Sequence, residues 1–83
     1  MTINQLCKNL QKKGLDARPR TIYNLSDGRS EAPAIMVYHD YNGPYPTEEA
    51  YNAAYTAREY ARKHNFYAET RGMCTGTIIY PLA

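Results

Sequence analysis

A chain of 83 residues with a formal net charge of +2 is long enough for one small domain, and this low charge speaks against a strongly basic nucleic-acid binder. Leu, Ile, Val and Phe number only twelve, so alanine and the nine tyrosines have to supply much of the core. No apolar run approaches the ~20 residues of a membrane-spanning helix, and the start of the chain does not resemble a signal peptide. We therefore expect a single cytoplasmic domain over residues 1–83 that does not act at membranes.

The first predicted element is a helix that begins after Thr2. Thr2 and Gln5 match a capping box, in which each side chain bonds the backbone amide of the other residue. Gly14 is a favourable left-handed stop, and Leu15 behind it is placed to pack on the last turn. The apolar residues between these ends recur at helical spacing and form one stripe: Ile3, Leu6, Cys7 and Leu10. Within this stripe we interpret Cys7 as a small buried hydrophobe.

Two strands joined by a turn are predicted next. Thr21–Leu25 and Ala32–His39 flank the turn residues Asp27 and Gly28. Because Pro33 has no N–H to donate, the second strand is expected to start at an edge or a bulge. The segment 41–46 follows as a predicted loop, since it contains one glycine and two prolines.

A second, longer helix is predicted from Thr47 to His64. Thr47 is a suitable N-cap, and Glu48 and Glu49 follow it where the helix dipole favours negative charge. The buried face of this helix is expected to be made mostly of alanine: Ala50, Ala53, Ala54, Ala57, Tyr60, Ala61 and His64. Such a face of small side chains allows the helix axis to lie close to a sheet.

The chain ends with a predicted hairpin of two strands, Phe66–Thr70 and Thr75–Tyr80, and its two halves resemble each other. The segments 12–18 and 63–69 both end a helix, supply a residue that tolerates the left-handed region (Gly14 or Asn65), and continue through an apolar residue and an alanine into a strand. We therefore predict an α+β fold in αββαββ order, with two helices on one face of a four-stranded antiparallel sheet. Chance similarity over seven positions is the alternative, and helices on opposite faces would contradict the repeat.

The sequence carries no recognisable catalytic or metal-binding pattern. The two histidines, His39 and His64, and the two cysteines, Cys7 and Cys74, stand singly, without the paired spacing of a zinc site or of a nucleophile with its base. Glycine-rich phosphate loops are absent as well. We therefore expect no enzymatic activity, no metal and no cofactor.

Three surfaces are candidates for binding. Tyr51, Tyr55, Arg58 and Arg62 form a stripe beside the alanine face of the second helix, with the residue types of interface hot spots and of nucleic-acid stacking. The segment 38–46 alternates tyrosines, among them Tyr41 and Tyr45, with Asn, Gly and Pro, as binding loops do. The sheet face away from the helices is the third, because residues on both faces of the strands are apolar. The alternative for the first two is that their tyrosines only cover a thin core.

The function that these features favour is a non-catalytic module that binds, and thereby inhibits or regulates, a larger protein. Compact domains of this size without catalytic residues are often inhibitors encoded by phages or other mobile elements, including anti-CRISPR-like inhibitors of host defence complexes. This last expectation concerns small proteins in general. The alternative is a small nucleic-acid-binding regulator that uses the basic N-terminal third and the Tyr51–Arg62 stripe. A homodimer through the open sheet face is a further expectation.

Overall fold

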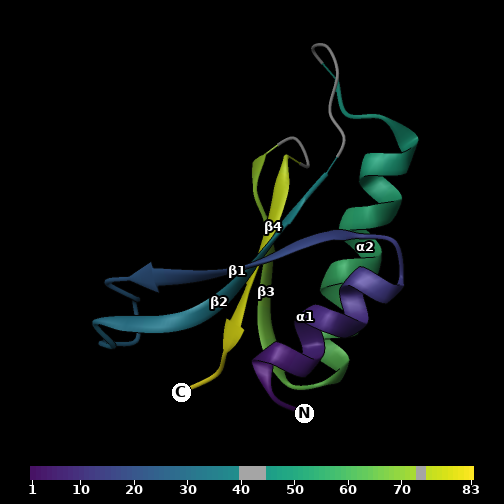
Figure 1. The fold of residues 1–83 in the computed structure, drawn as a ribbon. Helices are drawn as coiled ribbons and strands as arrows, with labels where there is room; N and C mark the ends of the chain where they lie inside the picture. The colour runs from purple at the N-terminus through teal and green to yellow at the C-terminus, as the bar shows by residue number, and fades with distance from the viewer. Residues whose placement is uncertain (40–44, 73–74) are drawn as a thin grey trace.

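The chain folds into one antiparallel sheet covered on one side by two helices (Figure 1). The computed structural model describes residues 1–39, 45–72 and 75–83. The strand order is β1-β2-β4-β3, and every neighbouring pair is antiparallel. The elements, in chain order, are α1 (Ile3–Lys12), β1 (Asp16–Tyr23), β2 (Glu31–Tyr38), α2 (Glu48–Lys63), β3 (Phe66–Thr70) and β4 (Gly76–Pro81). The predicted fold class and the αββαββ order are confirmed.

Both ends of α1 are capped as the sequence predicts. Thr2 Oγ1 accepts the Gln5 N–H at 3.2 Å, and Gln5 Oε1 accepts the Thr2 N–H at 2.8 Å. At the C-terminal end Gly14 adopts a φ of 85°, and the Leu15 N–H donates to the Leu10 carbonyl. The helix therefore ends in a Schellman-type cap that turns the chain directly into β1.

The first strand is longer than its sequence pattern suggests. It was expected from Thr21 but begins at Asp16, and it ends at Tyr23 rather than Leu25. The prediction of its start was wrong because Pro19 argues against a strand interior, whereas β1 is an edge strand on which the missing N–H of proline faces outward. Pro33 also lies within its strand, β2, beyond the residues of β2 that pair with β4.

Four alanines of the predicted face of α2 are buried, whereas Ala53, Tyr60 and His64 on the same predicted face are half-buried. Ala50, Ala54, Ala57 and Ala61 are all at most 1% exposed. Thr47 is the N-cap, and its hydroxyl accepts the Ala50 N–H at 3.1 Å. Side chains from both helices and all four strands meet in one core cluster, which includes Leu6, Cys7, Leu10, Ala17, Ile35, Val37, Ala57, Ala61, Phe66, Ala68 and Ile79. Since one cluster contains both helices, they share one face of the sheet.

The two halves match in detail beyond the order of their elements. Gly14 and Asn65, which are 51 positions apart, both have positive φ, 85° and 67°. The residue three positions before each, Gln11 or Arg62, donates a side-chain N–H to the carbonyl of Ala17 or Ala68, at 2.9 and 3.0 Å. The same bond therefore ties each helix to the first strand of its own hairpin.

The halves meet about a pseudo-two-fold axis at the centre of the sheet. Met36 of β2 pairs with Ile78 of β4 at this axis. A half-turn about the axis exchanges the neighbouring pair Ile35–Ile79 with the pair Val37–Thr77. An antiparallel pairing of two equivalent strands generates such an axis perpendicular to the sheet. Both helices lie on one face of the sheet, which agrees with the predicted repeat.

Candidate functional site

The tyrosines of the predicted α2 stripe lie at the surface. Tyr51 and Tyr55, one helical turn apart, are 56% and 60% exposed. Because α2 packs on the sheet through its alanines, neither ring is needed to bury that contact. The alternative that these tyrosines cover a thin core is therefore not supported for Tyr51 and Tyr55.

The arginines of the same stripe are held by the sheet rather than left free. Arg58 Nη1 donates to the Thr70 hydroxyl at 2.5 Å, and Arg62 Nη2 donates to the Ala68 carbonyl at 3.0 Å. Ala68 belongs to β3, whose outer edge has no partner strand, so Arg62 satisfies a carbonyl that would otherwise be open. The structure thus brings the four predicted residues together on one side of α2 and gives the two arginines a structural role.

The second predicted surface is described only in part. Tyr45, just ahead of α2, is 77% exposed, and Tyr38 at its other end is 41% exposed. Tyr41 lies outside the described residues. Tyr45 is thus placed at the surface near the N-terminal end of α2.

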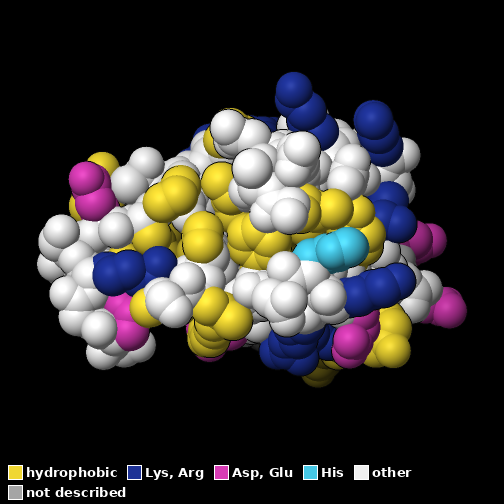
Figure 2. All heavy atoms as spheres, turned by 90° about the horizontal axis from the view of Figure 1, so that it is seen from below, with side chains coloured by type: hydrophobic (Ala, Val, Ile, Leu, Met, Phe, Trp, Pro, Cys, Tyr) yellow, Lys and Arg dark blue, Asp and Glu magenta, His cyan; other side chains and the backbone are white. Residues whose placement is uncertain are grey.

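The lower end of the molecule, where both termini lie (Figure 1), gathers hydrophobic side chains at the centre of its surface, with basic and acidic side chains around them (Figure 2). Met1 and Leu82, which belong to the two terminal segments at this end, are exposed. This surface provides apolar packing area and little that selects one partner over another.

The open face of the sheet, the third predicted surface, carries tyrosines and arginines of which only Tyr38 belonged to a predicted binding segment. Tyr38, Tyr67 and Tyr80 lie there among arginines, because they alternate with residues that face the helices. The two-residue alternation of Arg18 and Arg20 was hidden by the late predicted start of β1. The alternation of Tyr67 and Glu69 lies within the predicted strand Phe66–Thr70 and was not used. The apolar residues expected to be exposed on this face differ in burial: Ile78 is 4% exposed, Met36 is half-buried and Tyr38 is 41% exposed.

A buried chain of hydrogen bonds runs from His39 to α2. His39 Nε2 lies 2.7 Å from the Thr77 hydroxyl, which lies 3.0 Å from the Thr70 hydroxyl, and Thr70 accepts from Arg58. Since Arg58 is always a donor, every hydroxyl is satisfied if protons point along the chain toward His39 Nε2. This leaves the proton of the neutral ring on Nδ1, which has no partner among the described residues. Burial, and secondarily the charge of Arg58, lower the pKa of His39.

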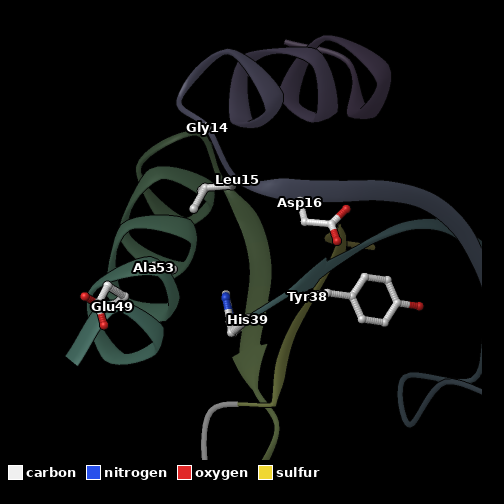
Figure 3. Close-up of a pocket in the computed structure, with 7 residues that line it drawn as sticks. All are labelled: Gly14, Leu15, Asp16, Tyr38, His39, Glu49 and Ala53. Atoms are coloured by element: carbon white, nitrogen blue, oxygen red, sulfur yellow. The ribbon is translucent and has the colours of Figure 1, made fainter. Parts of the chain in front are cut away.

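A cavity of about 430 Å³ lies beside His39 (Figure 3). Asp16 and Glu49 line it together with His39, so a histidine and two carboxylates share one cleft. Asp16 is engaged in a two-point ion pair with Arg18, at 3.0 and 3.1 Å, and the hydroxyl bonded to His39 belongs to Thr77, which is fully buried. A substrate in the cleft would not reach that hydroxyl, so the arrangement resembles a structural network more than a catalytic pair.

The remaining titratable residues do not form a recognisable centre. In residues 1–39, 45–72 and 75–83, no three His, Cys, Asp or Glu side chains come together as a metal site. Cys7 is buried, which raises the pKa of its thiol, as fits a small core residue; Cys74 lies outside the described residues. His64 is the C-cap of α2. No helix in the described part of the chain is long and apolar enough to span a membrane.

Comparisons with protein-family models, with curated proteins and with solved structures gave no significant match. Function therefore has to be argued from the geometry of the surfaces described above.

Proposed function

We propose that this protein is a non-catalytic binding module that inhibits or regulates a larger protein through the outer side of α2. The observation that carries the proposal is the pair Tyr51 and Tyr55, exposed one turn apart on a helix whose packing does not need them. Tyrosine is among the residues that dominate binding energy at protein interfaces, because it buries a large rigid ring and keeps a polar hydroxyl.

The support beneath these rings favours a preorganised surface. Arg58 and Arg62 are tied to β3, so the side of α2 that carries the tyrosines is fixed relative to the sheet. A surface that is already ordered loses less conformational entropy when it binds. The nucleic-acid alternative for this stripe needs the same two arginines to face phosphates, and both already donate to β3; the stripe therefore favours a protein partner.

The edge strands of the sheet disfavour backbone pairing with a partner, so a partner has to be recognised through side chains. On β1, Pro19 has no N–H and its carbonyl accepts from Arg20; on β3, the Ala68 carbonyl accepts from Arg62. Proline and side-chain caps are how edge strands avoid pairing with another chain. Addition of a partner strand is thus disfavoured, and the exposed face of α2 is the better docking surface. An inhibitor of a host defence complex, encoded by a phage or another mobile element, is the class of protein that we expect.

The proposal is tested by affinity capture with matched variants. The tagged full chain, Tyr51→Ala, Tyr55→Ala and the control Thr56→Ala are used as baits in lysate of the host cell, and captured proteins are identified by mass spectrometry. Thr56 is exposed on the same helix but outside the stripe. We expect one partner to be retained by the wild type and Thr56→Ala and lost, by tenfold or more, with either tyrosine variant. A partner that all four baits retain equally, or no specific partner at all, would count against the proposal.

A further inference from the structure

The open face of the sheet presents aromatic rings and guanidinium groups in place of aliphatic surface. Its central aliphatic residues, Ala34 and Ile78, are only 2% and 4% exposed. Tyr67 and Tyr80 stack with their ring centroids 4.5 Å apart and an interplanar angle of 26°. The guanidinium of Arg29 lies 5.8 Å from the Tyr80 ring. What this face offers a partner is therefore tyrosine rings and guanidinium groups, beside the half-buried Met36 and the exposed Glu69.

Tyr38, like Tyr80, has guanidinium groups beside its ring. The guanidinium carbons of Arg18 and Arg20 lie 4.9 and 5.9 Å from the centre of its ring. Under the pseudo-two-fold axis Tyr38 corresponds to Tyr80, and Arg20 corresponds to Arg71. Each end of the face thus has one tyrosine platform and one arginine.

Some charged side chains on this face are held in ion pairs and others are not. Asp16 is bound by Arg18, and Asp27 is bound by Arg29 at 2.7 Å. Glu69, which is exposed on the same face, accepts the Tyr67 hydroxyl at 2.9 Å and has no ion-pair partner among the described residues. Arg20 and Arg71 have no carboxylate partner among the described residues, and both are exposed. Arg20 donates to the Pro19 carbonyl at 2.8 Å and to the Tyr38 hydroxyl at 3.4 Å, so it would bind an anionic group only with its remaining N–H donors. Arg71 lines the hollow beside Tyr38 at the other end of the face.

The spacing of these groups suits an extended polymer. Tyr38 pairs with Gly76, and Tyr80 lies four residues further along β4, which is roughly 13 Å at the rise of a strand. Because Gly76 has no side chain, a hollow of about 440 Å³ lies between Tyr38, Met36 and Arg71. A flat ring entering this hollow would rest against Tyr38 beside the Arg71 guanidinium.

We propose that this open face is a second binding surface and that its occupant is a single-stranded polynucleotide. Unpaired bases stack on tyrosine rings and guanidinium planes, and the phosphates between them are neutralised by arginine. A duplex is disfavoured, because its bases are already stacked on one another. A protein partner is less favoured because Ala34 and Ile78 are covered and Met36 is half-buried, which leaves little aliphatic surface for an interface core. The surface is separate from the α2 stripe, which lies on the helical side of the sheet.

The test measures binding of fluorescently labelled oligonucleotides of about 12 nucleotides to the full chain by anisotropy, across a salt series. The probes are single-stranded oligo-U RNA, single-stranded oligo-dT DNA and a DNA duplex of the same length. We expect at least one single strand to bind more tightly than the duplex, with affinity falling as salt rises. The RNA and DNA arms decide which polynucleotide is preferred.

Variants locate the site. Tyr38→Ala should weaken binding of the preferred strand by about fivefold to a hundredfold, while Tyr38→Phe should retain it, because stacking needs the ring and not the hydroxyl. Arg20→Ala and Arg71→Ala should each reduce the slope of log K against log salt by about 0.7. The controls are Tyr55→Ala and Lys63→Ala, which remove a ring and a charge from α2 and should leave binding unchanged.

Thermal melting of each variant shows that a lost affinity is not a lost fold. The proposal is overturned if no probe binds, if the duplex binds as well as the single strands, or if the α2 controls weaken binding as much as the open-face variants. It is also overturned if sedimentation shows that the chain dimerises and that Tyr38→Ala dissociates the dimer, since the face would then be covered by a second copy. A loss of protein-partner capture in the α2 variants bears only on the proposed function above.

Discussion

His39 is the residue whose role changes most between sequence and structure. It was expected only to end a strand, yet it is 7% exposed and is the end of a hydrogen-bond chain that passes through two threonines to α2. Burial, with no partner for Nδ1 among the residues that the structure describes, makes the charged form of the ring unfavourable. The stability of the fold should therefore depend on the protonation of this one side chain.

We predict that acid destabilises the fold through His39. Its pKa is lowered in the folded state from an ordinary value of 6.5, so below that pH the unfolded chain binds the proton more readily than the folded one. This contribution to stability is complete above about pH 6.5 and is lost as the pH falls toward the lowered pKa of the folded state. Urea unfolding at pH 8, 7, 6 and 5 should give a midpoint that declines below pH 6.5.

The control for this prediction is His39→Gln, which keeps a polar group that bonds Thr77 and does not titrate. Its midpoint should be lower than that of the wild type at pH 8 but should change less between pH 7 and pH 5. An equal decline in both proteins would assign the acid sensitivity to other groups. Asp27, whose carboxyl pKa is lowered mainly by its hydrogen bond to Arg29, contributes only at lower pH, as its ordinary value is 3.8.

At the scale of the elements, α2 depends on the small size of its buried residues. Ala57 is fully buried beneath the helix and belongs to the core cluster. A larger side chain at this position would push the helix away from the sheet and strain the bonds from Arg58 and Arg62 to β3. The close approach of α2 thus depends on alanine in particular and not on hydrophobicity alone.

We predict that Ala57→Leu destabilises the protein by about 1–3 kcal/mol, because extra methylene groups in a packed core force side chains and backbone to shift. Urea unfolding followed by circular dichroism measures the change. Thr56→Leu, at the exposed neighbouring position, is the matched control and should change the free energy of unfolding by less than about 0.5 kcal/mol. Equal effects at the two positions would show that the wrong face of α2 has been taken as buried.

At the scale of the whole molecule, the two αββ halves are complementary rather than independent. The central pairing of β2 with β4 joins them, and Ile35 of one half packs in the same cluster as Ile79 of the other. A half of about 40 residues lies at the size below which chains seldom fold without disulfides, metals or association. The domain should therefore fold only as a unit.

We predict that a peptide of residues 1–39 lacks a cooperative unfolding transition, whereas the full chain unfolds in one transition. Circular dichroism during a thermal ramp checks both. The capping box at Thr2 and Gln5 should leave the peptide with residual helix at low temperature, so the decisive quantity is cooperativity and not helical signal. A sigmoidal transition for the isolated peptide that does not depend on its concentration would contradict this account.

Local signals predicted most of the secondary structure. Caps and apolar periodicity defined both helices, since each needs only residues three or four apart, and Asn65 was recognised as a left-handed stop. The start of β1 was missed because a proline is compatible with a strand only at an edge, and the position of a strand in the sheet is not a local property. The pairing of Met36 with Ile78, which places the two halves about their axis, is likewise non-local.

For the candidate surfaces, the sequence alone determined which residues share a face of one helix, because helical geometry relates Tyr51, Tyr55, Arg58 and Arg62 directly. Only the tertiary structure decided what those residues do: the arginines bond β3, and the rings stay exposed. It also brought Tyr38, Arg20 and Arg71 to one side of the sheet, although they are far apart in the chain. The physical reason is that periodicity relates near neighbours, whereas strand order and burial follow from packing the whole chain around one core.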